Sequence, residues 1–269
     1  MLGKFGLLGH HISYSLSPVI HRFSAGMLNL PVSYDLFDIP QSSLESFISS
    51  FQLEGQGLNI TTPHKSAVAR MFSIKNKSIN TLYKDDDGNW CASSTDGSGF
   101  IQALSHIDRS LEDFDAVLIL GSGGVVFSLI EAIDLVKPGI DIKIYRRNKA
   151  NDSGLTEVVK RIDFSSLSLG AISQDLSQLD QSKVLMVQAT SGPLRGDPLE
   201  YLVPCLKTFD GTFVDLTYGS HSALLDYSRK NGICNQDGLP MLIEQARLAQ
   251  ELWWKRSVPY RAIWEHLKL

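Results

Sequence analysis

The chain has 269 residues, of which 43% are hydrophobic and 20% are charged, and its formal net charge is −4. This length accommodates two domains of ordinary size, and the composition is that of a soluble globular protein. The mildly acidic charge offers no basic surface to nucleic acid or to an anionic membrane, and the longest apolar runs are only strand-length. We therefore expect neither a nucleic-acid partner nor a membrane partner.

The cysteine pattern bears on the compartment and on metal binding. Cys91, Cys205 and Cys234 are odd in number, widely spaced and free of any C-x-x-C pair. That pattern indicates reduced thiols in a cytoplasm and argues against a disulfide framework or a zinc site. The short N-terminal segment is broken by glycines, which is typical of a first strand and not of a signal peptide. We expect a cytoplasmic protein with no metal site.

Short apolar strands alternate with helical patterns almost throughout, which predicts an α/β fold. In the first third we expect strands at residues 4–8, 33–38, 57–60, 80–83 and 90–92. Helices are expected from about residue 18, over 44–51 and from residue 96. Ser17 and Thr62 are interpreted as helix N-caps, because Pro18 and Pro63 would follow at the first helical position, where a missing N–H costs nothing.

The hydrophobic pattern changes after residue 100. A buried parallel strand is predicted over 115–120, followed by a glycine-rich loop and a helix over 125–135. Further strands are expected at residues 141–145, 170–173, 184–188 and 212–216. Residues 239–269 have the pattern of two helices. The breaks near Gly99 and Gly238 predict a first α/β domain with a mixed sheet (residues 1–99, completed by 239–269) and an inserted Rossmann domain (residues 100–238).

The loop after residue 120 has the spacing of a dinucleotide site. A strand that ends in G-x-G-G and opens a helix lets backbone N–H groups approach a pyrophosphate at the helix N-terminus. The residues expected to form this loop are Gly121, Ser122, Gly123, Gly124 and Val125. One position is imperfect, since Val126 stands where glycine or alanine would bring helix and strand closest.

The end of the next predicted strand distinguishes the two nicotinamide cofactors. A NAD enzyme places a carboxylate here on the ribose 2′-hydroxyl, but this chain has none before Asp152. It has Arg146, Arg147 and Lys149 instead, and three cations suit a 2′-phosphate. A solvated basic loop is the plainer alternative. We predict NADP over NAD.

The heptapeptide N-I-T-T-P-H-K occupies residues 59–65 and ends in the first turn of a predicted helix. The positive end of the helix dipole disfavours an ammonium there, which suits Lys65 to general acid–base work. An ordinary surface lysine is the alternative. Asp96, at another predicted helix start, is favoured as a carboxylate. Beside Lys65 it would hold the ammonium in position, whereas on its own it would be a plain N-cap.

This heptapeptide closely resembles the N-V-T-x-P-x-K signature of the shikimate dehydrogenase family. Six further stretches resemble motifs of that family and occur in the family's order. They are S-L-S-P at 15–18, S-I-N-T at 78–81, T-D-G-S-G-F at 95–100, Q-A-T-S-G at 188–192, D-L-T-Y at 215–218 and G-L-P-M-L-I-E-Q-A at 238–246. The chain departs from the family's motifs at Tyr14, Arg22, Ser94, Gln188 and Pro193.

The resemblance implies reversible, NADPH-dependent reduction of 3-dehydroshikimate to shikimate in aromatic amino-acid (chorismate) biosynthesis. Lys65 would exchange the hydroxyl proton, and Asp96 would hold Lys65. The residues implied to bind the substrate are Ser15, Ser17, Asn59, Thr61, Asn80, Tyr218 and Gln245. Further cofactor contacts are implied for Thr190, Leu216 and Gly238. The first domain would then bind substrate and the second NADP.

Two alternatives stay open. One is a relative of broader specificity that oxidises quinate as well as shikimate and could use NAD, although the basic loop argues against NAD. The other is a catalytically silent dinucleotide-binding protein, which the five departures favour and the joint presence of Lys65 and Asp96 opposes. The sequence does not distinguish a monomer from a homodimer.

Overall fold

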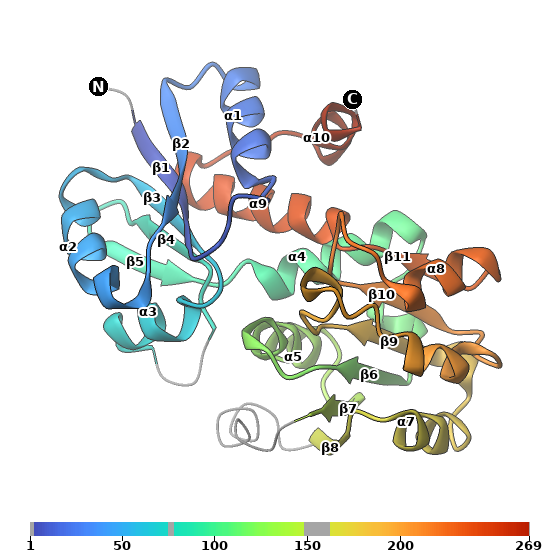
Figure 1. Ribbon diagram of the computed structural model, residues 1–269. Helices are drawn as coiled ribbons and strands as arrows, with labels where there is room; N and C mark the ends of the chain where they lie inside the picture. Colours follow the sequence, from blue (N-terminus) through green and yellow to red (C-terminus); the bar gives the residue numbers. More distant parts are fainter. Residues whose placement is uncertain (1–2, 75–77, 148–161, 269) are drawn as a thin grey trace. The chain divides into compact units, whose positions relative to one another are not determined.

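The structure is a computed structural model that describes residues 3–74, 78–147 and 162–268. The chain divides into two compact units, Met1–Gly99 with Leu242–Leu269, and Phe100–Met241 (Figure 1). Each unit has its own sheet and its own buried core. In the part of the chain that the structure describes, no helix is both long and apolar enough to cross a membrane.

The first unit is built on a five-stranded mixed sheet in the order β2-β1-β3-β4-β5. Its strands are β1 (Gly3–Gly9), β2 (Val32–Asp38), β3 (Gly57–Ile60), β4 (Thr81–Lys84) and β5 (Trp90–Ser93). β1 pairs in parallel with both β2 and β3, whereas β3, β4 and β5 pair antiparallel. The predicted mixed sheet is confirmed.

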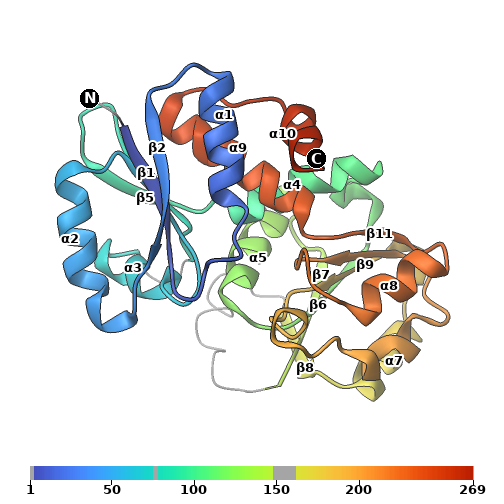
Figure 2. The same cartoon turned by 45° about the horizontal axis from the view of Figure 1, so that its top comes forward.

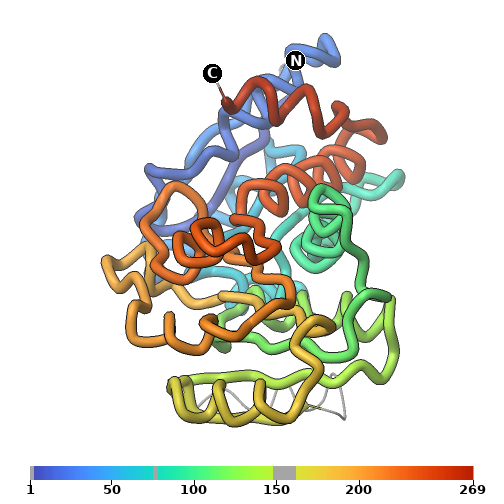
Figure 3. The backbone as a smooth tube through the Cα atoms, turned by 90° about the vertical axis from the view of Figure 1, so that its right-hand side faces the viewer, coloured from blue at the N-terminus to red at the C-terminus, as the bar shows by residue number. Residues whose placement is uncertain are grey.

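Helices cover both faces of this sheet. They are α1 (Ser17–Met27), α2 (Leu44–Glu54), α3 (Lys65–Met71), most of α9 (Leu239–Trp254), and α10 (Tyr260–Leu267). α2 and α3 cover one face and contribute Phe51 and Val68 to its core. α1 and α9 cover the other face (Figure 2). There the rings of Phe5 and Trp253 have centroids 5.1 Å apart. The C-terminal helix α10 packs against α1, so the end of the chain lies beside its N-terminal part (Figure 3).

The second unit is built on a six-stranded sheet in the order β11-β10-β9-β6-β7-β8, with parallel pairing throughout. Its strands are β6 (Ala116–Leu120), β7 (Asp141–Arg146), β8 (Ile162–Ser166), β9 (Val184–Gln188), β10 (Thr212–Asp215) and β11 (Cys234–Gln236). The chain moves outward in opposite directions from β6 and β9. The loops after these two strands therefore lie at the switch point where doubly wound sheets bind ligands.

The helices of the second unit form two layers. One face of the sheet is covered by α4 (Asp96–Leu104) and α5 (Gly124–Val136). The other face is covered by α7 (Leu169–Leu176), the 3-10 helix η6 (Glu200–Leu206) and α8 (Ala223–Lys230). Both faces are buried, which explains why β6 and β9 are continuous apolar runs.

The strand predicted over residues 170–173 is wrong, because this segment lies within α7. Ser168 caps the helix by accepting a hydrogen bond from the Ala171 N–H at 3.3 Å. Ile172 and Leu176, four residues apart, form its buried face. The strand in this part of the chain is β8, which the sequence analysis did not predict.

Both predicted N-caps are also wrong. α3 begins at Lys65 with His64 as its N-cap residue, after a turn in which the His64 N–H donates to the Thr61 carbonyl at 2.9 Å. α1 begins at Ser17 with Leu16 as its N-cap residue, and neither of these cap residues makes a side-chain hydrogen bond to its helix. The proline rule located both helix starts to within three residues but assigned the capping residue wrongly.

Candidate functional site

Lys65 and Asp96 form an ion pair in the first unit. Each is the first residue of its helix, α3 and α4 respectively, and the ammonium of Lys65 contacts one carboxylate oxygen of Asp96. The two side chains are only 15% and 9% exposed. Because so little water screens the pair, its electrostatic interaction is stronger than that of a surface pair.

Asn80, directly before β4, holds the other oxygen of Asp96. Its amide nitrogen lies 2.8 Å from Asp96 Oδ1, 2.9 Å from Thr95 Oγ1 and 3.2 Å from Gln245 Oε1. Its amide oxygen accepts a hydrogen bond from the Thr95 backbone N–H at 2.8 Å. One buried amide thus fixes Asp96 and brings Gln245 of α9 beside it.

A second buried amide, Asn59 on β3, extends this hydrogen-bonded group to α1. Asn59 Nδ2 donates to the Asn80 carbonyl at 3.2 Å and to Thr81 Oγ1 at 3.1 Å. Asn59 Oδ1 accepts from the Tyr34 hydroxyl at 2.7 Å. Burial raises the pKa of Tyr34 well above its usual value, and a hydrogen bond with the Ser17 side chain opposes that rise. The amide of Asn59 is therefore engaged inside the protein, where it connects Ser17 to Asn80.

The other predicted substrate residues lie as follows. Ser15 Oγ donates to Ser17 Oγ at 3.2 Å, so the two hydroxyls are adjacent. Thr61 follows β3, and its backbone N–H donates to the Leu8 carbonyl at 2.8 Å. Tyr218 is half-buried in the second unit, and its contact with substrate stays a prediction.

Gly99 lets α9 approach α4 closely enough for Gln245 to reach Asn80. A Cβ atom at Gly99 would lie 2.7 Å from the backbone nitrogen of Gln245.

We expect Gly99→Ala to lower the free energy of unfolding by about 1–3 kcal/mol, because a backbone contact of this kind cannot relax without moving a helix. Urea denaturation measures this value. Gly26→Ala is the matched control: that helical glycine has open space around it, so the change should be neutral or stabilising. Equal effects of the two changes would contradict the prediction.

The predicted dinucleotide loop occupies the switch point of the second unit. Gly121 follows β6 with a φ of +119°, and a Cβ there would lie 2.9 Å from the Ala189 carbonyl carbon. Gly123 is the N-cap residue of α5, so the next backbone N–H groups are those of a helix N-terminus. Gly238 is also constrained, since its Cβ would lie 2.2 Å from the Leu216 carbonyl oxygen. This backbone fits a pyrophosphate at the start of α5.

A buried carboxylate fastens the loops after β9 and β10. Asp215 accepts hydrogen bonds from Gln188 Nε2 at 3.2 Å, from the Thr217 N–H at 2.8 Å and from the Ser222 hydroxyl at 2.5 Å. Burial raises its pKa, and these hydrogen bonds oppose the rise. Gln188 in turn accepts from the Thr190 N–H. The Gln188 side chain, a departure from the family's motif, is thus hydrogen-bonded at both its amide nitrogen and its amide oxygen. The sequence analysis noted the D-x-x-Y motif for its tyrosine and missed the role of its aspartate.

The two described arginines of the predicted 2′-phosphate site have different partners. The Arg146 guanidinium lies over the Phe164 ring, 4.3 Å from its centroid. Arg147 Nη2 donates to Asp197 Oδ2 at 2.7 Å, and this hydrogen bond raises the pKa of Arg147. Lys149, also predicted here, lies outside the described residues. A 2′-phosphate would have to share Arg147 with Asp197, which the sequence analysis did not foresee.

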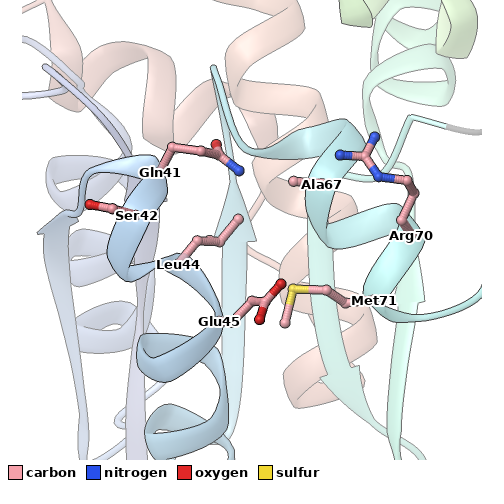
Figure 4. A pocket seen from close by; sticks show the side chains of 7 residues that line it. All are labelled: Gln41, Ser42, Leu44, Glu45, Ala67, Arg70 and Met71. Carbon is pink, nitrogen blue, oxygen red and sulfur yellow. The ribbon is translucent and has the colours of Figure 1, made fainter.

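A separate cavity of about 560 Å³ lies between α2 and α3 (Figure 4). It is lined by Gln41, Ser42, Leu44, Glu45, Ala67, Arg70 and Met71. Gln41 connects it to the segment that carries the ion pair, since Gln41 Oε1 lies 3.1 Å from Nδ1 of His64, the residue before Lys65. Lys65 and Asp96 do not line it, so this cavity is distinct from the candidate catalytic pair.

A glycine loop at the switch point of a parallel sheet in the second unit, and a shielded lysine–aspartate pair in the first unit, are features of a nucleotide-dependent dehydrogenase. Comparison with known proteins identifies the family. Residues 7–80 match the family model of the shikimate dehydrogenase substrate binding domain. A shikimate dehydrogenase (NADP(+)) from Legionella pneumophila is 31% identical, over 100% of this chain and 99% of its own. The chain therefore belongs to the shikimate dehydrogenase family.

Other relatives agree with this assignment. A shikimate dehydrogenase (NADP(+)) from Magnetococcus marinus is 28% identical, over 98% of this chain and 94% of its own. The crystal structure of shikimate 5-dehydrogenase from Thermus thermophilus in complex with NADP(H) and shikimate is 26% identical, with a TM-score of 0.79 over 100% of this chain and 99% of that one. Shikimate dehydrogenase from Aquifex aeolicus, at 24% identity and a TM-score of 0.86, has the same fold over 100% of this chain and 98% of its own.

Proposed function

We propose that this protein is an NADP-dependent shikimate dehydrogenase, which catalyses the reversible reduction of 3-dehydroshikimate to shikimate. The observation that carries the proposal is the shielded Lys65–Asp96 pair, held by Asn80 and Gln245, in a chain that aligns over its whole length with relatives of that name. NADPH supplies the hydride, and the protein supplies orientation and a proton.

Lys65 is the proton donor in the direction of reduction. As hydride reaches the carbonyl carbon, the ammonium of Lys65 gives its proton to the carbonyl oxygen, which becomes the shikimate hydroxyl. In the reverse direction the neutral amine takes that proton back. Asp96 contacts the ammonium and is itself fixed by the Asn80 amide. It therefore acts through Lys65.

The substrate ligands are proposed residue by residue. The adjacent hydroxyls of Ser15 and Ser17 suit the carboxylate, and Thr61, Asn80, Gln245 and Tyr218 suit the ring hydroxyls. The amides of Asn59 and Asn80 both have partners inside the protein, so we propose that each residue orients its neighbours as well as contacting the substrate.

NADP would bind the second unit. The start of α5 would hold the pyrophosphate, with Ser122, Gly124 and Val125 beside it, and Arg146, Arg147 and Lys149 would hold the 2′-phosphate. Thr190, Leu216 and Gly238 would line the nicotinamide end. On this assignment residues 1–99 with 239–269 form the substrate-binding part, and residues 100–238 form the cofactor-binding part. The three free cysteines favour a reducing compartment such as the cytoplasm.

Initial rates at the absorbance band of the reduced nicotinamide test the proposal. Shikimate and quinate are each assayed with NADP⁺ and with NAD⁺. We expect shikimate with NADP⁺ to give by far the largest kcat/KM, because the basic strand end suits a 2′-phosphate. Comparable turnover of quinate or of NAD⁺ would make the protein a relative of broader specificity. No turnover in any pair, with NADPH still bound, would make it a silent dinucleotide-binding protein.

A further inference from the structure

Two consecutive histidines and an aspartate gather where β1 and β2 end. His10 and His11 follow β1, and Asp38 is the last residue of β2. One ligand atom from each of the three lies within 4.8 Å of the others. The cysteine pattern, on which the expectation of no metal site was based, gives no information about these histidines.

The parallel register of the sheet places these residues together. Gly9 pairs with Asp38, so the residues after Gly9 emerge beside the aspartate. His10 Nδ1 lies 2.8 Å from Asp38 Oδ1, and the His11 backbone N–H donates to the same oxygen at 3.0 Å. The carboxylate is therefore oriented by backbone as well as by a side chain.

The backbone at His11 brings the second imidazole to the same side as the first. In extended chain, neighbouring side chains point to opposite faces. His11 instead has a φ of +57°, in the left-handed region that few non-glycine residues adopt. The ring centroids of His10 and His11 are consequently only 3.9 Å apart.

We propose that His10, His11 and Asp38 form a binding site for a divalent transition-metal ion such as Zn²⁺. Two imidazoles and one carboxylate are a common donor set for this ion, with the remaining positions taken by water. Ligand atoms around tetrahedral zinc are about 3.3–3.5 Å apart, given bonds of about 2.0–2.2 Å. The three ligand atoms already lie within 4.8 Å of one another, and His11 and Asp38 are exposed while His10 is partly exposed, so their side chains can adjust to this spacing.

The site is separate from the Lys65–Asp96 pair and does not depend on the proposed function. It does lie at the start of the loop that carries Ser15 and Ser17. The His10 N–H also donates to the Thr62 carbonyl at 3.2 Å, in the turn before α3. A bound metal would therefore join the loop after β1 to the end of β2, beside that turn.

Isothermal titration of the full-length, untagged protein with ZnCl₂ tests the site. We expect one Zn²⁺ per chain and an affinity roughly tenfold or more lower in His11→Asn and in Asp38→Asn. Asparagine tolerates the left-handed backbone at residue 11, so the first variant should fold normally. With Cu²⁺ as the probe, the electron paramagnetic resonance spectrum should show coupling to two imidazole nitrogens, and to one in His11→Asn.

His221→Gln is the matched control. His221 Nε2 lies 3.1 Å from Asp226 Oδ2, so this pair also joins a histidine to an aspartate. Among the described residues, no second imidazole joins it in a cluster of metal-binding side chains. Its removal should leave Zn²⁺ binding unchanged. No saturable binding to the wild type, equal binding by His11→Asn or Asp38→Asn, or a loss of binding in His221→Gln would each overturn the proposal.

Discussion

Replacement of Lys65 by alanine should lower kcat for shikimate oxidation by roughly 10²–10⁴-fold and leave NADPH binding nearly intact. The variant loses the group that exchanges the hydroxyl proton, and no second ammonium is paired with Asp96 in the described residues. Because the pair is largely shielded, water has limited access to take over the proton transfer. Initial rates with saturating substrate measure kcat, and the fluorescence change of NADPH on binding measures cofactor affinity.

Lys4→Ala is the control for the loss of a lysine. Lys4 pairs with Glu54 in the same unit, and their side chains are 34% and 65% exposed, so its removal should leave kcat near that of the wild type. A kcat for Lys65→Ala within a few-fold of the wild type would show that Lys65 does not transfer the proton. If the wild type itself had no activity, the kcat of Lys65→Ala could not be compared with it and the proposed function would be wrong. NADPH binding without turnover would then identify a silent relative.

Strand bounds were predicted correctly where the strand is buried on both faces and its sequence is a continuous hydrophobic run. β9 is buried over Val184–Gln188 and its predicted bounds are the observed ones. The strand predicted at 170–173 overlooked a helical pattern, since Ile172 and Leu176 are buried four residues apart, after a cap at Ser168. The N-cap of α3 was misassigned because Pro63 lies in a turn ahead of the helix, whereas α1 begins one residue before the predicted start, at Ser17.

The candidate site was predictable only for residues that carry a motif. Lys65, Asp96, Asn80 and Gln245 come from four separate stretches of the chain, and the structure brings them together. Tyr34 was not predictable, since its hydroxyl reaches Asn59 from β2 across β1, and no motif of the sequence links the two residues. Contacts of this range depend on register, which a single sequence does not reveal.

Two further departures from the family's motifs are also accommodated by the fold. Arg22 Nε donates to the Tyr34 carbonyl at 2.9 Å, and its Nη2 donates to Asp35 at 3.1 Å, so the arginine ties α1 to β2. Tyr14 is 59% exposed, so its larger side chain displaces nothing in the core. Together with the integrated Gln188, these observations weaken the argument that the departures mark a silent protein.

His21 should make the folded protein sensitive to mild acid. Its ring is fully buried on α1 and stacks on Tyr34 with centroids 4.3 Å apart. Burial lowers its pKa from 6.5 to about 3, against a smaller upward effect of a hydrogen bond with Asn59. Between these two values the unfolded chain binds a proton that the folded chain does not. The stabilising contribution is therefore complete above pH 6.5 and is lost as the pH falls, by about 2 kcal/mol between pH 7 and pH 5.

Urea denaturation at a series of pH values measures this loss of unfolding free energy. The His21→Gln variant lacks the titrating ring and should therefore lack the part of the loss that His21 causes. The variant is expected to be less stable at pH 7, because the stack on Tyr34 is lost, but its unfolding free energy should fall less steeply between pH 7 and pH 5. Most carboxylates titrate below this range, so the difference in slope isolates the histidine. Equal slopes for the wild type and His21→Gln would show that His21 can accept a proton without unfolding, and hence that water reaches the space between α1 and β2.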